Sequence, residues 1–504
     1  MIDSLPPPRP RPSPVPVGVG AIALRLPRFR VRLEDWCAWY GEDWDKVRTT
    51  VGRAFRVPGP RENVYTLAAG AALRLILDND VDPRQVGFLA LGTESSTDNS
   101  AGAIIVKGML DRALERLGRP RISRACEVPE FKHACLGGVY ALKGALRYVA
   151  ADGAGRKAIV ISADVAEYEH GSSGERTQGA GAVAQLVEEH PRLWTVDLRE
   201  SAAASAYRGV DFRKPLARRA AAARAGAFRT PEYPVFNGTY STVCYTDEAL
   251  HAVARLLAKL DLTARDLFHR MDGAFFHRPY RRLPFNVLAA LYVWGLTRDA
   301  EHHAELMELC RRCGADFDAV LIEAAGHPDL FRDGELGHEI NREAYPEAMR
   351  VVKHFRETAK FAEVAERKIS LGLATMEELG NIYTGSMPAW IAAGLEEALL
   401  GGADLADAAF LAVGYGSGDA AEASILRVVP QWRAAAGRIG FVRALDGAVD
   451  LSREQYEALH AGLPAELPEL PPDGGFEIDR VGDTRSESFE DAGIEYYRFR
   501  PPPG

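Results

Sequence analysis

Several features are missing from this chain of 504 residues, and each absence excludes a class of protein. No run of about 18 apolar residues occurs, so the sequence predicts no membrane-spanning helix. The net charge of -9 argues against a protein that binds nucleic acid through bulk positive charge. Only six cysteines are scattered along the chain, unlike the dense framework of a disulfide-stabilised secreted domain, and we expect them to be reduced.

The N-terminal region shows no targeting pattern. Prolines are dense from Pro6 to Pro16, and neither the apolar segment nor the cleavage site of a secretory signal peptide accompanies them. We therefore expect residues 1–15 to form a disordered or polyproline-type lead-in. We also expect the protein to be cytoplasmic.

Strand-like runs rich in Val and Ile alternate with alanine-rich helical stretches, which is the pattern of an α/β protein. We expect strands at 86–91, 157–163, 181–187, 274–277, 408–413 and 424–429. We expect helices at 67–78, 137–150, 247–260, 284–294, 346–367 and 387–400.

Two distant segments of the chain share one form. Residues 158–164 are an apolar strand, and after a loop a cluster of small residues leads into a second apolar strand over 179–186. Residues 409–429 repeat this order. The likeness indicates that two halves of the chain are copies of one unit.

Cys135 is the strongest candidate for chemistry. It precedes Gly137, Gly138 and the predicted helix 137–150, in which apolar residues recur at three- and four-residue intervals. At a helix N-terminus, unpaired backbone N–H groups favour thiolate over thiol, and the glycines leave space above the sulfur for a substrate carbonyl. A nucleophilic cysteine is our interpretation, and a small buried core residue is the alternative.

Short motifs in a fixed order along the chain carry a family resemblance. They are Gly92-Thr93-Glu94, Ala134-Cys135 with Gly137-Gly138, Ala163-Asp164-Val165-Ala166 with 179–182, Ala206-Tyr207 with 211–215, Phe276-His277-Arg278-Pro279-Tyr280, Gly380-Asn381-Ile382-Tyr383-Thr384, and Gly414-Tyr415-Gly416-Ser417-Gly418. On these motifs the chain resembles the hydroxymethylglutaryl-CoA synthases of the thiolase and ketosynthase superfamily. The resemblance extends from residue 16 to residue 499, apart from much of 298–365 and a proline-rich, acidic stretch at 462–490.

The resemblance implies the thiolase fold, in which two pseudo-duplicated α/β halves form a five-layered αβαβα core, usually in a homodimer. The N-terminal half, with the nucleophile, would span 16–195. The C-terminal half would span 196–504 and contain a divergent insertion at 298–365.

The resemblance also implies an acyltransferase that acts on acetyl-CoA and acetoacetyl-CoA without a cofactor or metal. Acetyl passes to Cys135, which conserves thioester energy and holds the group in place. Glu94 then removes a methyl proton, for which burial must raise its pKa. The carbanion equivalent adds to the ketone, and hydrolysis releases hydroxymethylglutaryl-CoA for the mevalonate pathway to isoprenoids.

Other residues match family positions. His277 matches the histidine that holds the acceptor and hydrogen-bonds its ketone oxygen, and the backbone of Cys135 with that of Gly416 or Ser417 could form an oxyanion hole. The resemblance assigns substrate binding to Asn381, Asp164, Asp211, Thr177, Tyr383, Ser417 and Gly416, and CoA binding to Arg278, Arg282 and Lys214. The alternatives are solvated carboxylates for Glu94, Asp164 and Asp211, a structural histidine, and an ordinary charged surface for the cations.

The chain also departs from the family pattern. Leu136 follows the nucleophile where these synthases commonly have tyrosine, which removes a hydroxyl near the acyl group. Arg282 replaces a usual lysine, and Arg278 is large for its place. The poorly matched region 298–365 contains four potential zinc ligands, although an alanine- and leucine-rich helix is the preferred interpretation: His302, His303, Cys310 and Cys313.

Two further motif interpretations are rejected. Residues 18–23 satisfy a small-residue dinucleotide pattern, but no strand of normal length precedes them and Pro27 interrupts the helix that should follow. The glycine-rich run 414–418 lacks the serine placement of a nucleophile elbow and the Lys-Ser/Thr of a phosphate loop.

Three functional hypotheses remain. The first is the primary-metabolic synthase. The second is a hydroxymethylglutaryl-acyl-carrier-protein synthase for polyketide β-branching, or a homologue with another β-ketoacyl acceptor, in which the arginine-rich segment 213–229 could dock an acidic carrier protein. The third is a non-catalytic homologue that acts as a binding subunit.

Overall fold

The computed structural model describes residues 15–96, 100–153, 155–211, 214, 233–235, 237–326, 328–334, 337–471 and 473–502. Residues 1–14 of the predicted lead-in, and all of the arginine-rich segment 213–229 except Lys214, lie outside the described residues.

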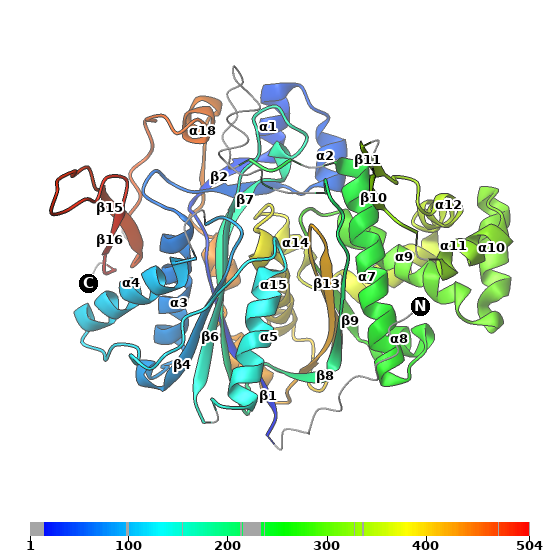
Figure 1. The fold of residues 1–504 in the computed structure, drawn as a ribbon, viewed down its shortest axis with the longest axis horizontal. Helices are drawn as coiled ribbons and strands as arrows, with labels where there is room; N and C mark the ends of the chain where they lie inside the picture. The colour runs from blue at the N-terminus through cyan, green and yellow to red at the C-terminus, as the bar shows by residue number, and fades with distance from the viewer. Residues whose placement is uncertain are drawn as a thin grey trace.

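Nine strands of the described chain form the central sheet, in the order β5-β4-β6-β7-β1-β8-β13-β12-β9 (Figure 1). Their bounds are β1 Val17–Arg25, β4 Val86–Gly92, β5 Glu130–Phe131, β6 Lys157–Ala166, β7 Gly179–Glu189, β8 Trp194–Ser205, β9 Gly273–Phe276, β12 Ala409–Gly416 and β13 Ala420–Val428. Every residue of β4 and β12 is buried, as in strands that are covered on both faces.

The sheet repeats one topology. In the first half, β1 pairs antiparallel with β7, β7 antiparallel with β6, and β6 parallel with β4. In the second half, β8, β13, β12 and β9 follow with the same three senses of pairing. The resemblance between residues 158–186 and 409–429 therefore reflects equivalent hairpins, β6–β7 and β12–β13.

Helices cover and separate the two halves of the sheet. Six of them form the layers: α3 Val64–Asp78, α4 Gly102–Arg116, α5 Gly137–Ala150, α7 Gly238–Leu260, α9 Leu283–Thr297 and α15 Ser386–Leu400. Figure 1 shows α3 and α4 outside the first half, α5 and α15 between the halves, and α7 outside the second half. This is the five-layered arrangement of the thiolase fold, as predicted.

The remaining elements lie around this core. The helices are α1 Leu33–Tyr40, α2 Trp44–Thr50, α8 Ala264–Arg270, α10 His303–Cys313, α11 Phe317–Ala325, α12 Pro346–Phe355, α13 Ala359–Ile369, α14 Leu373–Met376, α16 Trp432–Ala436, α17 Phe441–Leu445 and α18 Arg453–His460. The strands are β2 Phe29–Arg32, β3 Ala54–Val57, β10 Phe331–Gly334, β11 Gly337–Ile340, β14 Val449–Asp450, β15 Phe476–Val481 and β16 Glu495–Phe499, and short 3-10 turns include η2 Glu175–Thr177 and η4 Tyr383–Gly385.

Most predicted elements are present, with two informative differences, and the rejection of the dinucleotide pattern agrees with the structure. Helix α7 begins at Gly238, before the predicted 247. The single helix predicted at 346–367 is two, because Thr358 caps a second helix by accepting the backbone N–H of Phe361. The glycines at 18 and 20, which matched the dinucleotide pattern, lie inside β1, so they form no phosphate loop.

The divergent region 298–365 is mainly helical and packs on α9 through α10, α11 and α12. Its potential zinc ligands do not converge. The imidazole of His302 contacts Asp299 at 2.9 Å, the ring of His303 packs against Phe317, and Cys310 is buried in α10. All six cysteines of the chain are free thiols. Among the described residues, no helix combines the length and apolar character needed to cross a bilayer.

Candidate active site

The nucleophile segment is a tight turn that leads into α5. Leu136 is the N-cap of α5, so Cys135 precedes the helix by two residues. Ala134 adopts a left-handed conformation (φ 42°), which costs a residue other than glycine about 1–3 kcal/mol. The turn is closed by Leu136 N–H, which donates to the carbonyl of His133 at 2.9 Å.

The Cys135 thiol, just before α5, faces the Glu94 carboxylate, just after β4. The thiol donates to Oε1 of Glu94 over 3.4 Å, and Cys135 is only 8% exposed. Three buried side chains, Ala166, Tyr168 and Tyr383, complete an apolar cluster around the sulfur. This arrangement brings the predicted nucleophile and the predicted base together in buried, largely apolar surroundings.

Burial controls the proton affinity of both groups. Burial, followed by the nearby charge of Asp164, raises the pKa of Glu94 to about 8, while the Lys214 ammonium opposes the rise. Burial and the two carboxylates also hold the pKa of Cys135 well above its ordinary value. The prediction that the helix N-terminus favours the thiolate was therefore wrong, because desolvation and negative charge dominate at this position.

Asp164 organises the segment that carries the base. Its side chain is fully buried in β6. Oδ1 accepts the hydroxyl of Thr93, the hydroxyl of Ser95 and the backbone N–H of Glu94, at 2.8 to 2.9 Å. Oδ2 accepts the backbone N–H of Thr384 at 2.9 Å and also its hydroxyl. Asp164 thus joins the end of β4 to η4 and orients Glu94, whereas its predicted contact with substrate stays a prediction.

Two glycines at the site allow close packing. A Cβ on Gly138 would lie 2.2 Å from the hydroxyl of Ser162, and one on Gly416 would lie 2.4 Å from the carbonyl oxygen of His133. Gly138 therefore lets α5 approach the sheet, and it does not leave open space for substrate as predicted. Gly416 lets the end of β12 approach the nucleophile turn, where an oxyanion hole was predicted. Leu136 is fully buried and packs against Gly416 at the end of β12.

His277 follows β9 and is held by backbone and aromatic contacts. The backbone N–H of His277 donates to the carbonyl of Val413 at 2.8 Å, and the backbone carbonyl of His277 accepts the hydroxyl of Tyr245 at 2.8 Å. Its ring lies 6.1 Å from that of Tyr245 and 6.4 Å from that of Tyr415, centroid to centroid. Burial lowers the pKa of His277 to about 3, so the imidazole is neutral and can donate one N–H to a ketone oxygen.

Asn381, Thr177 and Tyr383 meet in one loop cluster. The backbone N–H of Asn381 donates to the carbonyl of Thr177 at 2.9 Å, and Oδ1 of Asn381 accepts the backbone N–H of Tyr383 at 2.9 Å. Tyr383, in turn, contacts the sulfur-lining cluster. The three predicted residues are thus adjacent, and their contacts with substrate stay predictions.

The three predicted CoA-binding cations are not grouped at the surface. Arg278 is 1% exposed and donates to the carbonyl of Met376, and a contact with a CoA phosphate would require this side chain to leave its buried position. The Lys214 ammonium donates to the backbone carbonyl of Glu94 at 3.1 Å, so it lies beside the base. Arg282 is exposed, with its backbone N–H bonded to Thr50.

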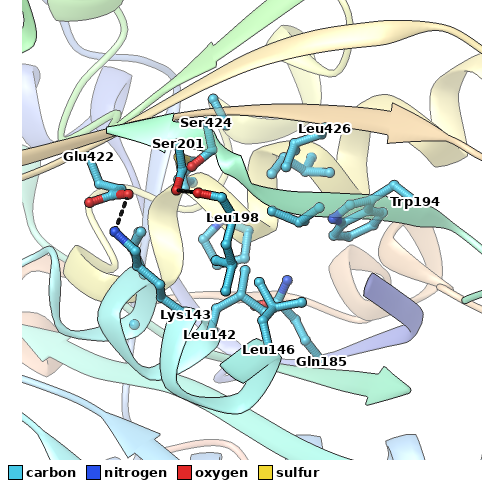
Figure 2. Close-up of a pocket in the computed structure, with 17 residues that line it drawn as sticks. Leu142, Lys143, Leu146, Gln185, Trp194, Leu198, Ser201, Glu422, Ser424 and Leu426 are labelled. Carbon is cyan, nitrogen blue, oxygen red and sulfur yellow. Dashed lines mark hydrogen bonds and ion pairs between the residues drawn. The ribbon is translucent and has the colours of Figure 1, made fainter. Parts of the chain in front are cut away.

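A partly buried ion pair holds α5 against the second half of the molecule. Lys143 of α5 contacts Glu422 of β13, with 2.5 Å between Nζ and Oε1, as Figure 2 shows. Both residues line a cavity of about 40 Å³. The Glu422 side chain is 1% exposed. Since α5 follows the nucleophile turn, this pair helps to set the position of Cys135 relative to β12.

Several residues at the site were missed by sequence reasoning. Thr93 and Thr384 lay within the quoted motifs, and the hydroxyl of Thr93 directly before the predicted base Glu94 was an available signal. Tyr168 and Tyr245 carried no such signal, because their place beside Cys135 and His277 comes only from the packing of distant segments.

Comparisons with known proteins relate the chain to hydroxymethylglutaryl-CoA synthases. A family model described as hydroxymethylglutaryl-coenzyme A synthase N terminal matches residues 13–191. A hydroxymethylglutaryl-CoA synthase of Haloferax volcanii is 27% identical over 424 residues, which cover 83% of this chain and 85% of that protein. Another, from Dictyostelium discoideum, is 32% identical over 45% of this chain and 43% of its own length.

Solved structures extend the likeness to the whole chain. MvaS in complex with 3-hydroxy-3-methylglutaryl coenzyme A has a TM-score of 0.73 at 26% identity, with 96% of this chain and 99% of that chain covered. The HMG synthase of the curacin pathway, solved with acetyl donor-ACP, shares the fold at a TM-score of 0.66 and 18% identity, with coverage of 96% and 100%. With its paired cysteine and glutamate on a thiolase-like fold, the chain is similar to hydroxymethylglutaryl-CoA synthases over most of its length.

Proposed function

We propose that this protein is an acyltransferase that condenses acetyl-CoA with acetoacetyl-CoA and releases 3-hydroxy-3-methylglutaryl-CoA and CoA. The observation that carries the proposal is the buried contact of the Cys135 thiol with the Glu94 carboxylate. A cysteine alone could serve many reactions, but a thiol beside a base of raised pKa suits acyl transfer followed by removal of a weakly acidic proton.

The first step is transfer of acetyl to Cys135. Ionised Glu94 takes the thiol proton while sulfur attacks the thioester carbonyl of acetyl-CoA, and the tetrahedral intermediate collapses with loss of the CoA sulfur. Glu94 returns the proton to that sulfur, so free CoA leaves and Glu94 is ionised again. The thiol needs this assistance because its own pKa lies far above neutral pH.

The second step forms the carbon–carbon bond. Glu94 removes a methyl proton from the acetyl group, and the resulting carbanion equivalent adds to the ketone carbon of the acceptor. Neutral His277 donates a hydrogen bond to the ketone oxygen as negative charge develops there. The proton held by Glu94 then passes to this alkoxide. Water finally cleaves the thioester to Cys135, which gives a carboxylate and restores the thiol.

A β-ketoacyl group on an acyl carrier protein is a second candidate acceptor. Coenzyme A carries three phosphate groups, whereas the phosphopantetheine arm of a carrier protein carries one. Of the three cations predicted for CoA, two are turned inward in the described structure, and only Arg282 is exposed. The candidate is supported by the HMG synthase of the curacin pathway, which shares the fold and was solved with acetyl donor-ACP.

One experiment tests both candidates. The pure protein is incubated with acetyl-CoA, and mass spectrometry locates an acetyl adduct on Cys135, with the Cys135→Ser variant as control. Acetoacetyl-CoA or acetoacetyl carrier protein is then added. Product from acetoacetyl-CoA supports the primary proposal, while an adduct that turns over only with the carrier protein refutes it in favour of the second. Failure to form any adduct would support a non-catalytic homologue.

We also propose that the enzyme is a cytoplasmic homodimer. Six free thiols fit a reducing compartment, and a closed pair of subunits is the commonest assembly of soluble enzymes. Light scattering on the purified protein, with a monomeric mass as the contrary result, tests the assembly.

A further inference from the structure

A second buried acidic cluster lies where β8 and β12 end. Asp211 follows β8 and is 1% exposed, and Asp419 lies in the turn between β12 and β13 and is 3% exposed. The hydroxyl of Tyr415 is 3.0 Å from Oδ2 of Asp211 and 2.8 Å from Oδ1 of Asp419. Two carboxyl groups therefore meet at one phenol.

The single hydroxyl proton of Tyr415 cannot be donated to two carboxylates at once. A phenol has a single proton, so it can donate to only one of the two oxygens within reach. The other contact is favourable only if that carboxyl group itself carries a proton. Within the described residues, the remaining oxygens, Oδ1 of Asp211 and Oδ2 of Asp419, have no hydrogen-bond partner. Two ionised carboxylates placed so closely in a buried site would repel each other.

The surrounding charges do not neutralise the pair. Arg208 is the described cation that faces Asp419, with 3.8 Å between Nε and Oδ2, and the same guanidinium is engaged by Asp247 and Glu248 of α7. The described titratable groups that face the pair are Arg208 from the segment after β8, Tyr415 from β12, and Tyr240 and Cys244 from α7. Since Asp247 and Glu248 also bind Arg208, one guanidinium serves three carboxyl groups.

The same turn positions the active site. The backbone of Asp419 exchanges two hydrogen bonds with that of Ala206, which ties the turn after Gly416 to the segment that follows β8. The ring of Tyr415 stacks on Tyr245 at 4.5 Å, and Tyr245 donates to the carbonyl of His277. A displacement of Tyr415 would therefore reach His277 through one intervening ring.

We propose that Asp211 and Asp419 share a single proton and, as an acid–carboxylate pair, act as positioning residues that hold Tyr415, and through Tyr245 the acceptor-binding His277, in place. This proposal rests on the proposed function. The raised pKa of Asp419, caused first by burial and then by Asp211, is consistent with it. A cation is the competing occupant, since ligand atoms of Asp211, Asp419 and Cys244 lie within 4.8 Å of one another. The guanidinium of Arg208 beside the same oxygens disfavours a cation.

The kinetic test compares Asp419→Asn with Asp419→Ala, and uses Asp152→Asn, an exposed aspartate far from the cluster in the sequence, as the matched control. Asparagine supplies an N–H in place of the shared proton, whereas alanine supplies nothing. We expect Asp419→Ala to form the acetyl-Cys135 adduct normally but to lose at least tenfold in the condensation rate and to raise the KM for the acceptor. Asp419→Asn should restore most of that loss.

Equilibrium unfolding in urea between pH 6 and 8 gives a readout that is independent of activity. Because the folded wild type holds a proton that the unfolded chain has released, its unfolding constant relative to that of Asp419→Asn should rise about tenfold per pH unit. A flat ratio, or Asp419→Asn behaving like Asp419→Ala, would overturn the shared proton. One metal ion per wild-type chain, measured by elemental analysis and lost in Asp419→Asn, would also overturn the shared proton. Absence of the acetyl adduct in the wild type would instead refute the proposed function.

Discussion

Replacement of Glu94 by glutamine separates the two roles that the carboxylate has in the proposed reaction. The variant keeps a side chain of the same shape but cannot accept a proton. Glu94 is also one of the causes that raise the pKa of Cys135. Its removal should make the thiol easier to ionise, which partly offsets the loss of the base that takes the thiol proton in the first step. We therefore expect Glu94→Gln still to form the acetyl adduct, more slowly than the wild type, while it loses condensation.

The raised pKa of Glu94 sets the expected pH dependence. A value of about 8 against an ordinary 4.5 means that the site favours the neutral acid by about 5 kcal/mol relative to water. A base acts when it is deprotonated, and at pH 7 only about one tenth of Glu94 is ionised, against one half at pH 8. The rate of proton removal should rise about fivefold between these two values, and about tenfold per pH unit below them.

Exchange of the acetyl methyl protons with solvent isolates this step from acceptor binding. The enzyme is acetylated in D₂O buffers, and mass spectrometry of the Cys135 peptide follows the incorporation of deuterium with time. We expect Glu94→Gln to slow exchange by about 10²–10⁴-fold and to abolish its pH dependence between 7 and 8. Exchange in Glu94→Gln at the wild-type rate, or a wild-type rate that does not change with pH, would refute this role for Glu94.

Three further predictions concern the surroundings of the base and the nucleophile. Gly416→Ala places a Cβ 2.4 Å from a carbonyl oxygen of the nucleophile turn, so acetylation measured by mass spectrometry should slow at least tenfold, and a normal rate would contradict the packing described. Thr384→Val removes a hydroxyl bonded to buried Asp164 and should lower the free energy of unfolding in urea by about 1–3 kcal/mol, with Thr384→Ser close to wild type. Lys214→Met removes the ammonium that lowers the pKa of Glu94, so the pH profile of methyl exchange should move to higher pH, and a shift to lower pH would count against it.

Much of the local structure could be predicted from the sequence. Helix α5 has the predicted bounds because apolar spacing and the glycines at its start are local features. The repeated strand–loop–strand form predicted two equivalent halves, and the sheet repeats the same pairings. The break at Thr358 within the predicted helix 346–367 was missed, although a capping threonine was an available signal.

The sequence by itself predicted the likeness to hydroxymethylglutaryl-CoA synthases, the two equivalent halves, and Cys135 and Glu94 as the candidate nucleophile and base, because motif order and periodicity are properties of the linear chain. Tertiary structure alone decided how these groups behave. Cys135 is a thiol of raised pKa because folding buries it beside Glu94, 41 residues away in the chain. Asp211 meets Asp419 only because β8 and the β12–β13 turn end at the same place. Desolvation and the proximity of charges depend on three-dimensional distance, which no local pattern of residues specifies.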